Sequence, residues 1–224
     1  LISAGFGFML NALVYMALMR VDILMLGLIA DEEAVGLYRV AVEGGMLVAF
    51  AYGAATTVLA AEYARLHGAS ESVRLQLLVR QSGRLIMLAG CAVAIPLIVY
   101  PEQIITAIFG IEYVKASLAL TVLAIGHAST FLFGDPVYLL NMTGHHKKIT
   151  TLVAIGLFIC VILCLALIPP FGMLGASIAA SSALVIYRAL ACYTVYRTIC
   201  INCAVVGKFP QEYRSNYSMD KEQR

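Results

Sequence analysis

Six long apolar stretches constrain the fold of this chain more than any other feature of its sequence. They run over residues 4–29, 34–62, 79–100, 115–141, 148–168 and 173–199. A helix needs about 20 mostly apolar residues to cross the hydrocarbon core of a bilayer. A membrane β-barrel would instead show segments of about ten residues that alternate between apolar and polar, and this alternation is absent. The stretches therefore predict an all-α, polytopic membrane bundle of about six transmembrane helices.

Composition supports a membrane protein over a soluble one. The chain is 62% hydrophobic and only 12% charged, whereas a soluble domain is about half apolar and about a quarter charged. The net charge of +2 is small, and the basic residues form no single stripe, so no nucleic-acid partner is expected. The sequence begins at Leu1 rather than at a methionine, and we expect it to be part of a longer chain. Residues 1–200 form the predicted membrane domain, and 201–224 a polar tail.

Basic residues between the stretches predict the orientation, because loops rich in lysine and arginine stay in the cytoplasm. One set of loops and the tail carry Arg65, Arg74, Arg80, Arg84, Lys147, Lys148, Arg197, Lys208, Arg214, Lys221 and Arg224. The opposite set carries Lys115 beside Asp31, Glu32, Glu33, Glu102 and Glu112. Both ends of the chain are therefore predicted to be cytoplasmic. The stretch 70–82 mixes apolar residues with arginines, as a short interfacial helix does.

Motifs for catalysis or metal binding are missing from the sequence. The pair Cys200 and Cys203 forms a lone CxxC without a second pair, which does not favour a metal or redox site. We expect no metal, no cofactor and no enzymatic activity. A membrane-embedded glycan-modifying enzyme would need a large loop with catalytic residues, and the loops here are short. A structural membrane subunit without a transport role is a further alternative.

Ionisable side chains inside the predicted spans are the candidate functional residues. Each such group costs about 2.5–3.5 kcal/mol to insert, so it needs a reason to be there. The candidate substrate-binding or cavity residues are Arg20, Arg39 and Arg188. The candidates for balancing these charges or carrying a coupling ion are Asp22, Glu43, Asp135 and His127.

Two cross-helix ion pairs are possible near the outer end of the first two stretches. Arg20 and Glu43 lie at similar depths when the two helices pack antiparallel, as do Asp22 and Arg39. These pairs would either fix the register of the two helices or line a water-filled cavity that contacts an ionic substrate. The residues alone leave both interpretations open.

Arg188 and Asp135 are the remaining charges within the spans. Asp135 is the candidate partner of Arg188 across the bundle, and the guanidinium fork of an arginine matches the oxygens of a phosphate. Pro136 follows Asp135 and predicts a kink in that helix, which is a feature of transporters as well as of simple packing. His127 is more typical of a hydrogen-bonded core histidine than of a proton carrier.

Several motifs occur in an order and spacing that resembles a known family. They lie in residues 22–27, 35–41, 101–113, 141–147 and 169–176. Over about residues 1–200, this series is similar to the C-terminal half of the polysaccharide-biosynthesis flippases. These belong to the multidrug/oligosaccharidyl-lipid/polysaccharide exporter superfamily. Asp22, Gly36, Tyr38, Gly110 and Tyr113 match the family pattern as architectural positions at helix ends, whereas the paired histidines His145 and His146 depart from it.

The resemblance implies two six-helix lobes around a central cavity that works by alternating access. It also implies a substrate of oligosaccharide linked to polyprenyl pyrophosphate, with the N-terminal half of the same chain as the first lobe. We therefore predict a flippase of the bacterial inner membrane that serves O-antigen, capsule or exopolysaccharide assembly. Its partners would be lipid-linked oligosaccharide, membrane lipids and a coupling ion such as H⁺ or Na⁺. A cation-coupled multidrug exporter of the same superfamily is the alternative.

Overall fold

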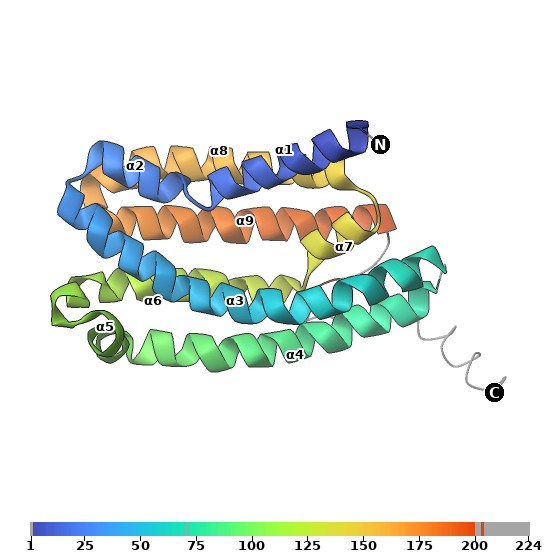
Figure 1. The fold of residues 1–224 in the computed structure, drawn as a ribbon, viewed down its shortest axis with the longest axis horizontal. Coiled ribbons are helices and arrows are strands. Elements are labelled where there is room, and N and C mark those ends of the chain that lie inside the picture. The colour runs from blue at the N-terminus through green and yellow to red at the C-terminus, as the bar shows by residue number, and fades with distance from the viewer. Residues whose placement is uncertain (1, 70, 200–202, 204–224) are drawn as a thin grey trace.

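The computed structural model describes residues 2–69, 71–199 and 203. Every regular element in these residues is helical (Figure 1). In chain order the elements are α1 (Ile2–Leu18), α2 (Val21–Ile29), α3 (Glu32–Gly68), α4 (Ser72–Val99), α5 (Pro101–Phe109), the 3₁₀ helix η1 (Ile111–Ala116), α6 (Ser117–Thr130), the 3₁₀ helix η2 (Phe131–Phe133), α7 (Pro136–Met142), α8 (His146–Phe171) and α9 (Met173–Ile199). The prediction of an all-α membrane bundle is confirmed.

Each of the apolar stretches coincides with one or more of these helices. Among the described residues, four helices are long and apolar enough to cross a membrane, and a fifth span is added if the bent pair α1–α2 counts as one. The predicted stretch 34–62 forms the central part of α3, which is 37 residues long and packs against α4 and α6. The described residues thus contain four to five candidate spans, whereas the sequence predicted about six.

Two of the predicted helices are broken rather than continuous. The first stretch divides into α1 and α2, which meet at an angle of 45° around Met19 and Arg20. The fourth stretch, predicted as one kinked helix, ends at Phe133 and resumes as α7 at Pro136. Gly134 lies between them with a φ of +64°, a conformation that glycine adopts without steric cost. Pro136 then starts α7, where its missing N–H costs nothing.

The two sets of loops that the charge pattern separates lie at opposite ends of the bundle (Figure 1). At one end the Lys115 Nζ lies 3.0 Å from the Glu33 Oε1. At the other end the Lys148 Nζ donates to the Thr198 Oγ1 at 2.8 Å. Which end faces the cytoplasm stays a prediction. The stretch 70–82 is not a separate interfacial helix, because α4 runs without interruption from Ser72.

The seams between α9 and its neighbours depend on small residues, which let membrane helices approach closely. A Cβ atom added at Gly175 in α9 would overlap the backbone carbonyl of Leu167 in α8. On the other side of α9, a Cβ at Gly126 in α6 would lie 2.5 Å from the Ser181 Cβ. The Ser181 hydroxyl donates across this second seam to the Val122 carbonyl at 3.1 Å. Helix α9 therefore packs closely against both α8 and α6.

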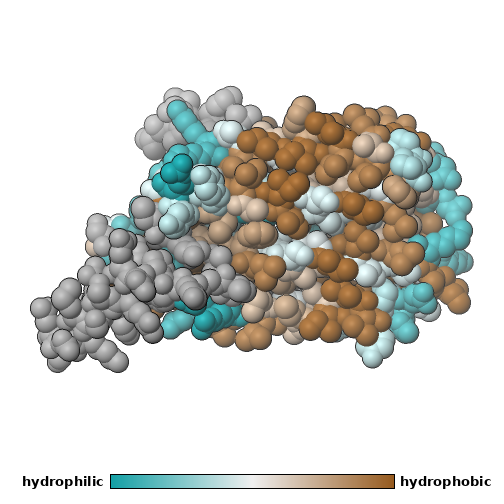
Figure 2. All heavy atoms as spheres, turned by 180° about the vertical axis from the view of Figure 1, so that it is seen from behind, coloured by the Kyte–Doolittle hydropathy of each residue, from teal (hydrophilic) through white to brown (hydrophobic). Residues whose placement is uncertain are grey.

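One face of the bundle is a broad apolar belt between two polar ends (Figure 2). This is the pattern expected of a surface in contact with lipid. Of the predicted tail 201–224, only Cys203 lies within the described residues. It is buried, and its carbonyl lies against Gly134. The rest of the tail, and Cys200 of the CxxC motif, lie outside the described part of the chain.

Candidate functional site: a polar cavity at the break between α1 and α2

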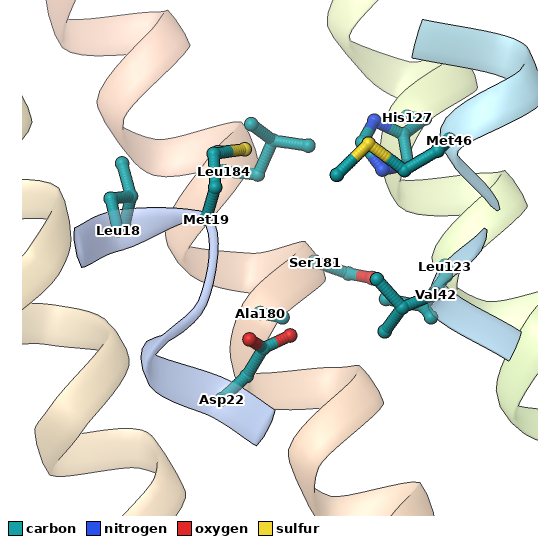
Figure 3. Close-up of a pocket in the computed structure, with 10 residues that line it drawn as sticks. All are labelled: Leu18, Met19, Asp22, Val42, Met46, Leu123, His127, Ala180, Ser181 and Leu184. Atoms are coloured by element: carbon teal, nitrogen blue, oxygen red, sulfur yellow. The ribbon is translucent and has the colours of Figure 1, made fainter. Parts of the chain in front are cut away.

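Two adjoining cavities lie where the break between α1 and α2 faces α3, α6 and α9. The smaller, of about 50 Å³, is lined by Leu18, Met19, Asp22, Val42, Met46, Leu123, His127, Ala180, Ser181 and Leu184 (Figure 3). The larger, of about 240 Å³, is lined by Tyr15, Met19, Met46, Ala49, Gly53, His127, Thr130, Phe131, Tyr138, Leu184 and Arg188. The two share Met19, Met46, His127 and Leu184. Both are mainly apolar with a few polar groups, as ligand pockets usually are.

Asp22 forms one side of the smaller cavity and is held in a fixed position. It lies in the first turn of α2, where the helix dipole favours a negative charge. Its Oδ2 accepts a hydrogen bond from the Tyr38 hydroxyl at 2.6 Å, and its Oδ1 accepts from the Ile23 N–H at 2.9 Å. Both Asp22 and Tyr38 are buried. This bond ties α2 to α3 and agrees with the architectural role that the family pattern assigns to both residues.

The predicted pair between Asp22 and Arg39 is not among the ion pairs of the described residues. Tyr38 takes the place expected for Arg39, whose side chain is exposed. Successive residues on a helix point about 100° apart, so only one of these two neighbours can face α2. The sequence alone did not show which one.

The predicted pair between Arg20 and Glu43 is confirmed, with 3.6 Å between the Arg20 Nη1 and the Glu43 Oε1. Their side chains are 50% and 48% exposed, so the pair lies on the surface of the bundle rather than in the cavity. Arg39 lies one turn before Glu43 and is also exposed. We call this surface, defined by Arg20, Arg39, Glu43 and Leu47, the charged flank. Lipid contact there would cost several kcal/mol per charge, so the flank faces water or another part of the protein.

Arg188 lines the larger cavity and is only 9% exposed. Its guanidinium carbon lies 5.8 Å from the centre of the Tyr187 ring, within the range of a cation–π contact. The pair between Arg188 and Asp135 stays a prediction. Asp135 is buried next to Gly134, in the electrostatic neighbourhood of Tyr63 and Cys203.

The structure thus divides the predicted residues into three groups. Asp22, His127 and Arg188 line the cavities, whereas Arg20, Arg39 and Glu43 lie on the charged flank, and Asp135 belongs to neither. Four polar residues that complete the cavity walls were not predicted from the sequence: Tyr15, Thr130, Tyr138 and Ser181. In the sequence, each of these residues is marked only by a hydroxyl within an apolar stretch. A hydroxyl there is a weaker indication of function than a charge. Among the described residues, no group of three His, Cys, Asp or Glu side chains is placed to hold a metal ion.

The fold and the cavity define a class: a polytopic helical membrane protein with a buried polar site and a charged flank at membrane depth. Comparison with protein families then places the chain within this class. Residues 1–118, more than half of the chain, match the family model described as polysaccharide biosynthesis protein. The chain belongs to this family. The matched region includes the α1–α2 break, Asp22, Tyr38 and the charged flank. No curated protein and no solved structure matches the chain.

Proposed function

We propose that this protein is a flippase that carries polyprenyl-pyrophosphate-linked oligosaccharide across the bacterial inner membrane for surface polysaccharide assembly. The observation that carries the proposal is the buried Arg188 in a cavity that adjoins the α1–α2 break. A lipid-linked pyrophosphate needs a cationic contact at membrane depth, because its charge cannot cross the hydrocarbon core alone. Membership of a polysaccharide biosynthesis family supports a substrate from the synthesis of such polymers.

The size of the cavity indicates which part of the substrate this bundle would bind. Pockets for drug-sized ligands occupy about 300–1,000 Å³, and the larger cavity here is about 240 Å³. It suits one charged group and not an oligosaccharide. The sugars would lie along the charged flank, between this lobe and the N-terminal half of the same chain. Arg20 and Arg39 would there contact acidic sugars or the pyrophosphate, with Glu43 balancing Arg20.

Breaks in the helices supply a place for the movement that alternating access requires. Discontinuous helices at a binding site are common in transporters, and hinges are usually a few residues at the ends of elements. Met19 and Arg20 join two helices at 45° directly beside the cavity. We propose that α1 and α2 change their angle as the cavity opens to one side of the membrane and then to the other. Orientation with both ends in the cytoplasm is part of the proposal.

Asp22 favours a second candidate function, a cation-coupled multidrug exporter. A buried carboxylate beside an apolar cavity is what a drug cation or a coupling ion would need. The competing features are that both carboxylate oxygens already accept hydrogen bonds and that a buried arginine lines the adjoining cavity. These two features favour an anionic substrate. Asp22 would then anchor α2 to α3 or bind a coupling ion.

Complementation of a gene deletion tests the proposal. Arg20→Ala, Arg39→Ala and Arg188→Ala are each expressed at the normal level, and surface polysaccharide and drug resistance are both measured. The matched control is Arg65→Ala, which removes an arginine paired with Glu62 at the end of the bundle. We expect Arg188→Ala to abolish surface polysaccharide and the control to preserve it. Normal polysaccharide in all three cavity and flank variants would refute the proposal, and a loss of drug resistance alone would favour the exporter.

A further inference from the structure

The short helix α5 lies across one end of the bundle, whereas its neighbours α4 and α6 run along the bundle (Figure 1). It follows α4 directly, with Tyr100 between the two helices, and it leads through Gly110 into η1. Gly110 has a φ of +102°, which lets the chain turn there without steric cost. At this end of the bundle the Lys115 Nζ of η1 lies 3.0 Å from the Glu33 Oε1 of α3.

Helix α5 is amphipathic, and the bundle covers only part of its apolar side. Because successive helical residues are about 100° apart, the apolar residues share one side: Pro101, Ile104, Ile105, Ile108 and Phe109. Ile105 lies in the middle of this side and is 1% exposed. Ile108 and Phe109 lie to either side of it and are 59% and 38% exposed. The polar residues on the opposite side are also exposed: Glu102, Gln103 and Thr106.

The exposed apolar surface continues beyond α5 into η1. Ile111, the first residue of η1, is 76% exposed. The ring of Phe109 packs edge-to-face with that of Tyr113, with 6.5 Å between the ring centres, and this contact holds the end of α5 against η1. We call Ile108, Phe109 and Ile111 the end patch. Exposed apolar side chains that adjoin one another mark a surface that binds a partner.

The outer side of α4 indicates which partner α5 meets. Helix α4 is long and apolar enough to cross a membrane. One side of it exposes a row of large apolar residues with helical spacing: Leu85, Leu88, Ile95 and Val99. This row, which suits lipid, ends at Tyr100, which is 57% exposed where α5 begins. Tyrosine is enriched at the boundary between membrane and water, so α5 begins at the depth of the lipid headgroups.

Charge indicates the kind of lipid that α5 would contact. Interfacial helices bind through buried apolar area and through attraction of basic residues to anionic lipids. Residues 100–116 carry two glutamates, Glu102 and Glu112, and one basic residue, Lys115. Lys115 already pairs with Glu33. Attraction to anionic lipid is therefore not available to this segment, and apolar contact with zwitterionic lipid is the remaining source of binding.

We propose that α5 and the end patch form an interfacial anchor, which inserts Ile108, Phe109 and Ile111 among the headgroups and upper acyl chains of zwitterionic phospholipids. The polar side of α5 then faces water. Through the pair between Lys115 and Glu33 the anchor also fixes the depth of the turn between α2 and α3. The inference does not rest on the proposed function. It places an interfacial helix at the end of α4, opposite to the end where the sequence predicted one over residues 70–82.

Tryptophan fluorescence tests the anchor, because the chain contains no tryptophan of its own. Ile108→Trp, Gln103→Trp and Phe158→Trp are each purified in nanodiscs of phosphatidylcholine brominated either near the headgroup or near the chain ends. We expect Ile108→Trp to lose more fluorescence to the shallow bromine and Phe158→Trp, in the middle of α8, to lose more to the deep one. Gln103→Trp, on the polar side of α5, should respond to neither and be quenched by iodide in the water.

Each of the other outcomes at position 108 would overturn the proposal. Quenching by iodide would place the end patch in water, and quenching mainly by the deep bromine would place α5 within the hydrocarbon core. Quenching by neither would show that protein covers the patch, either the N-terminal half of the chain or a second copy. Replacing part of the phosphatidylcholine by phosphatidylglycerol should not increase the shallow quenching. An increase would refute the preference for zwitterionic lipid.

A pair of charge substitutions tests the anchor without a tryptophan. Ile108 and Ala107 are neighbours on α5, and both are exposed, but Ala107 lies toward the polar side. Ile108→Glu should lower the unfolding temperature in phosphatidylcholine nanodiscs, because it places a charge among the acyl chains. Ala107→Glu should leave that temperature unchanged. Equal shifts in the two variants, or no shift in either, would contradict the anchor and leave the flippase proposal as it stands.

Discussion

The charged flank and the outer surface of α8 lie at similar depths in the bundle but expose opposite kinds of side chain. On α3, Arg39 and Glu43 are exposed. On α8, Phe158, Ile162 and Leu165 are 67%, 48% and 56% exposed. Lipid tolerates the second set and strongly disfavours the first. The bundle therefore has two sides, one suited to lipid and one to water or another protein surface.

The surroundings of the cavity and the α8–α9 interface also differ in the continuity of their helices. Helices α8 and α9 run unbroken for 26 and 27 residues and pack closely together through Gly175. The cavity, in contrast, is bordered by the break between α1 and α2 and by the segment where α6 gives way to α7. Continuous helices that pack closely are rigid, whereas breaks between helices can act as hinges. We infer that movement is concentrated on the cavity side.

Gly175→Val should have the largest effect, because it disrupts the rigid side. The added side chain would overlap the Leu167 carbonyl, and two helix backbones would have to separate. We expect a loss of more than about 3 kcal/mol of stability, seen as little folded protein after detergent extraction. The matched control is Gly36→Ala on α3, where an added Cβ meets no atom within 4 Å. Normal folding of the Gly175 variant would show that α8 and α9 are not rigidly joined.

Phe158→Arg and Leu47→Arg compare the two sides directly. Phe158 is 67% exposed near the middle of α8, and Leu47 is 48% exposed one turn after Glu43 on α3. An arginine in lipid costs about 2.5–3.5 kcal/mol, so Phe158→Arg should sharply reduce membrane insertion. Leu47→Arg should insert nearly normally because the flank does not face lipid. Immunoblots of carbonate-washed membranes measure both. Equal losses of membrane insertion in the two variants would contradict the distinction between a lipid-facing side and the charged flank.

Tyr38→Phe should have an intermediate effect on the junction of α2 with α3. It removes a hydroxyl that donates to Asp22 at 2.6 Å and leaves a buried carboxylate with one donor fewer. We expect a loss of about 1–3 kcal/mol, measured by thermal unfolding in detergent. Adding Asp22→Asn should cost less than the sum of the two single changes, since the pair acts as a unit. The exposed Tyr100→Phe serves as the control.

His145 predicts a smaller, pH-dependent effect at the end of the bundle. Burial, together with the nearby Lys148, lowers the pKa of His145 below its ordinary value. The folded state therefore binds fewer protons than the unfolded state, and stability should fall as the pH drops below about 6.5. His145→Asn should flatten this part of the pH profile. An unchanged pH profile would show that the turn between α7 and α8 does not contribute to the pH dependence of stability.

Periodicity and composition predicted much of the fold, since an apolar stretch long enough to cross a membrane has few alternatives to a helix. The breaks were harder to predict. Pro136 marked its position, but the separation of α7 from α6 depends on the positive φ of Gly134 and on Cys203 packed against it. No comparable residue marks the break at Met19. The hydrogen bond between Asp22 and Tyr38 holds α2 against α3 just after this bend.

Only the charged residues of the candidate site could be predicted from the sequence. Arg188 was identified because an arginine in lipid needs a reason, and Arg20 and Glu43 were paired because antiparallel helices match their depths. Tyr15 and Tyr138 could not be found in this way, because tyrosine is compatible with both core and cavity. The choice between Tyr38 and Arg39 as the partner of Asp22 depends on the rotation of α3, which sequence spacing does not determine.

Accessibility of the two sides to water is the most direct test of the account. In a functional chain without its native cysteines, Leu47→Cys and Phe158→Cys are each exposed to a membrane-impermeant maleimide in sealed vesicles and in vesicles opened by freezing and thawing. We expect the cysteine at position 47 to be labelled and the cysteine at position 158 to be protected. Protection of both positions, or labelling of position 158 alone, would contradict the claim that the charged flank faces an aqueous path.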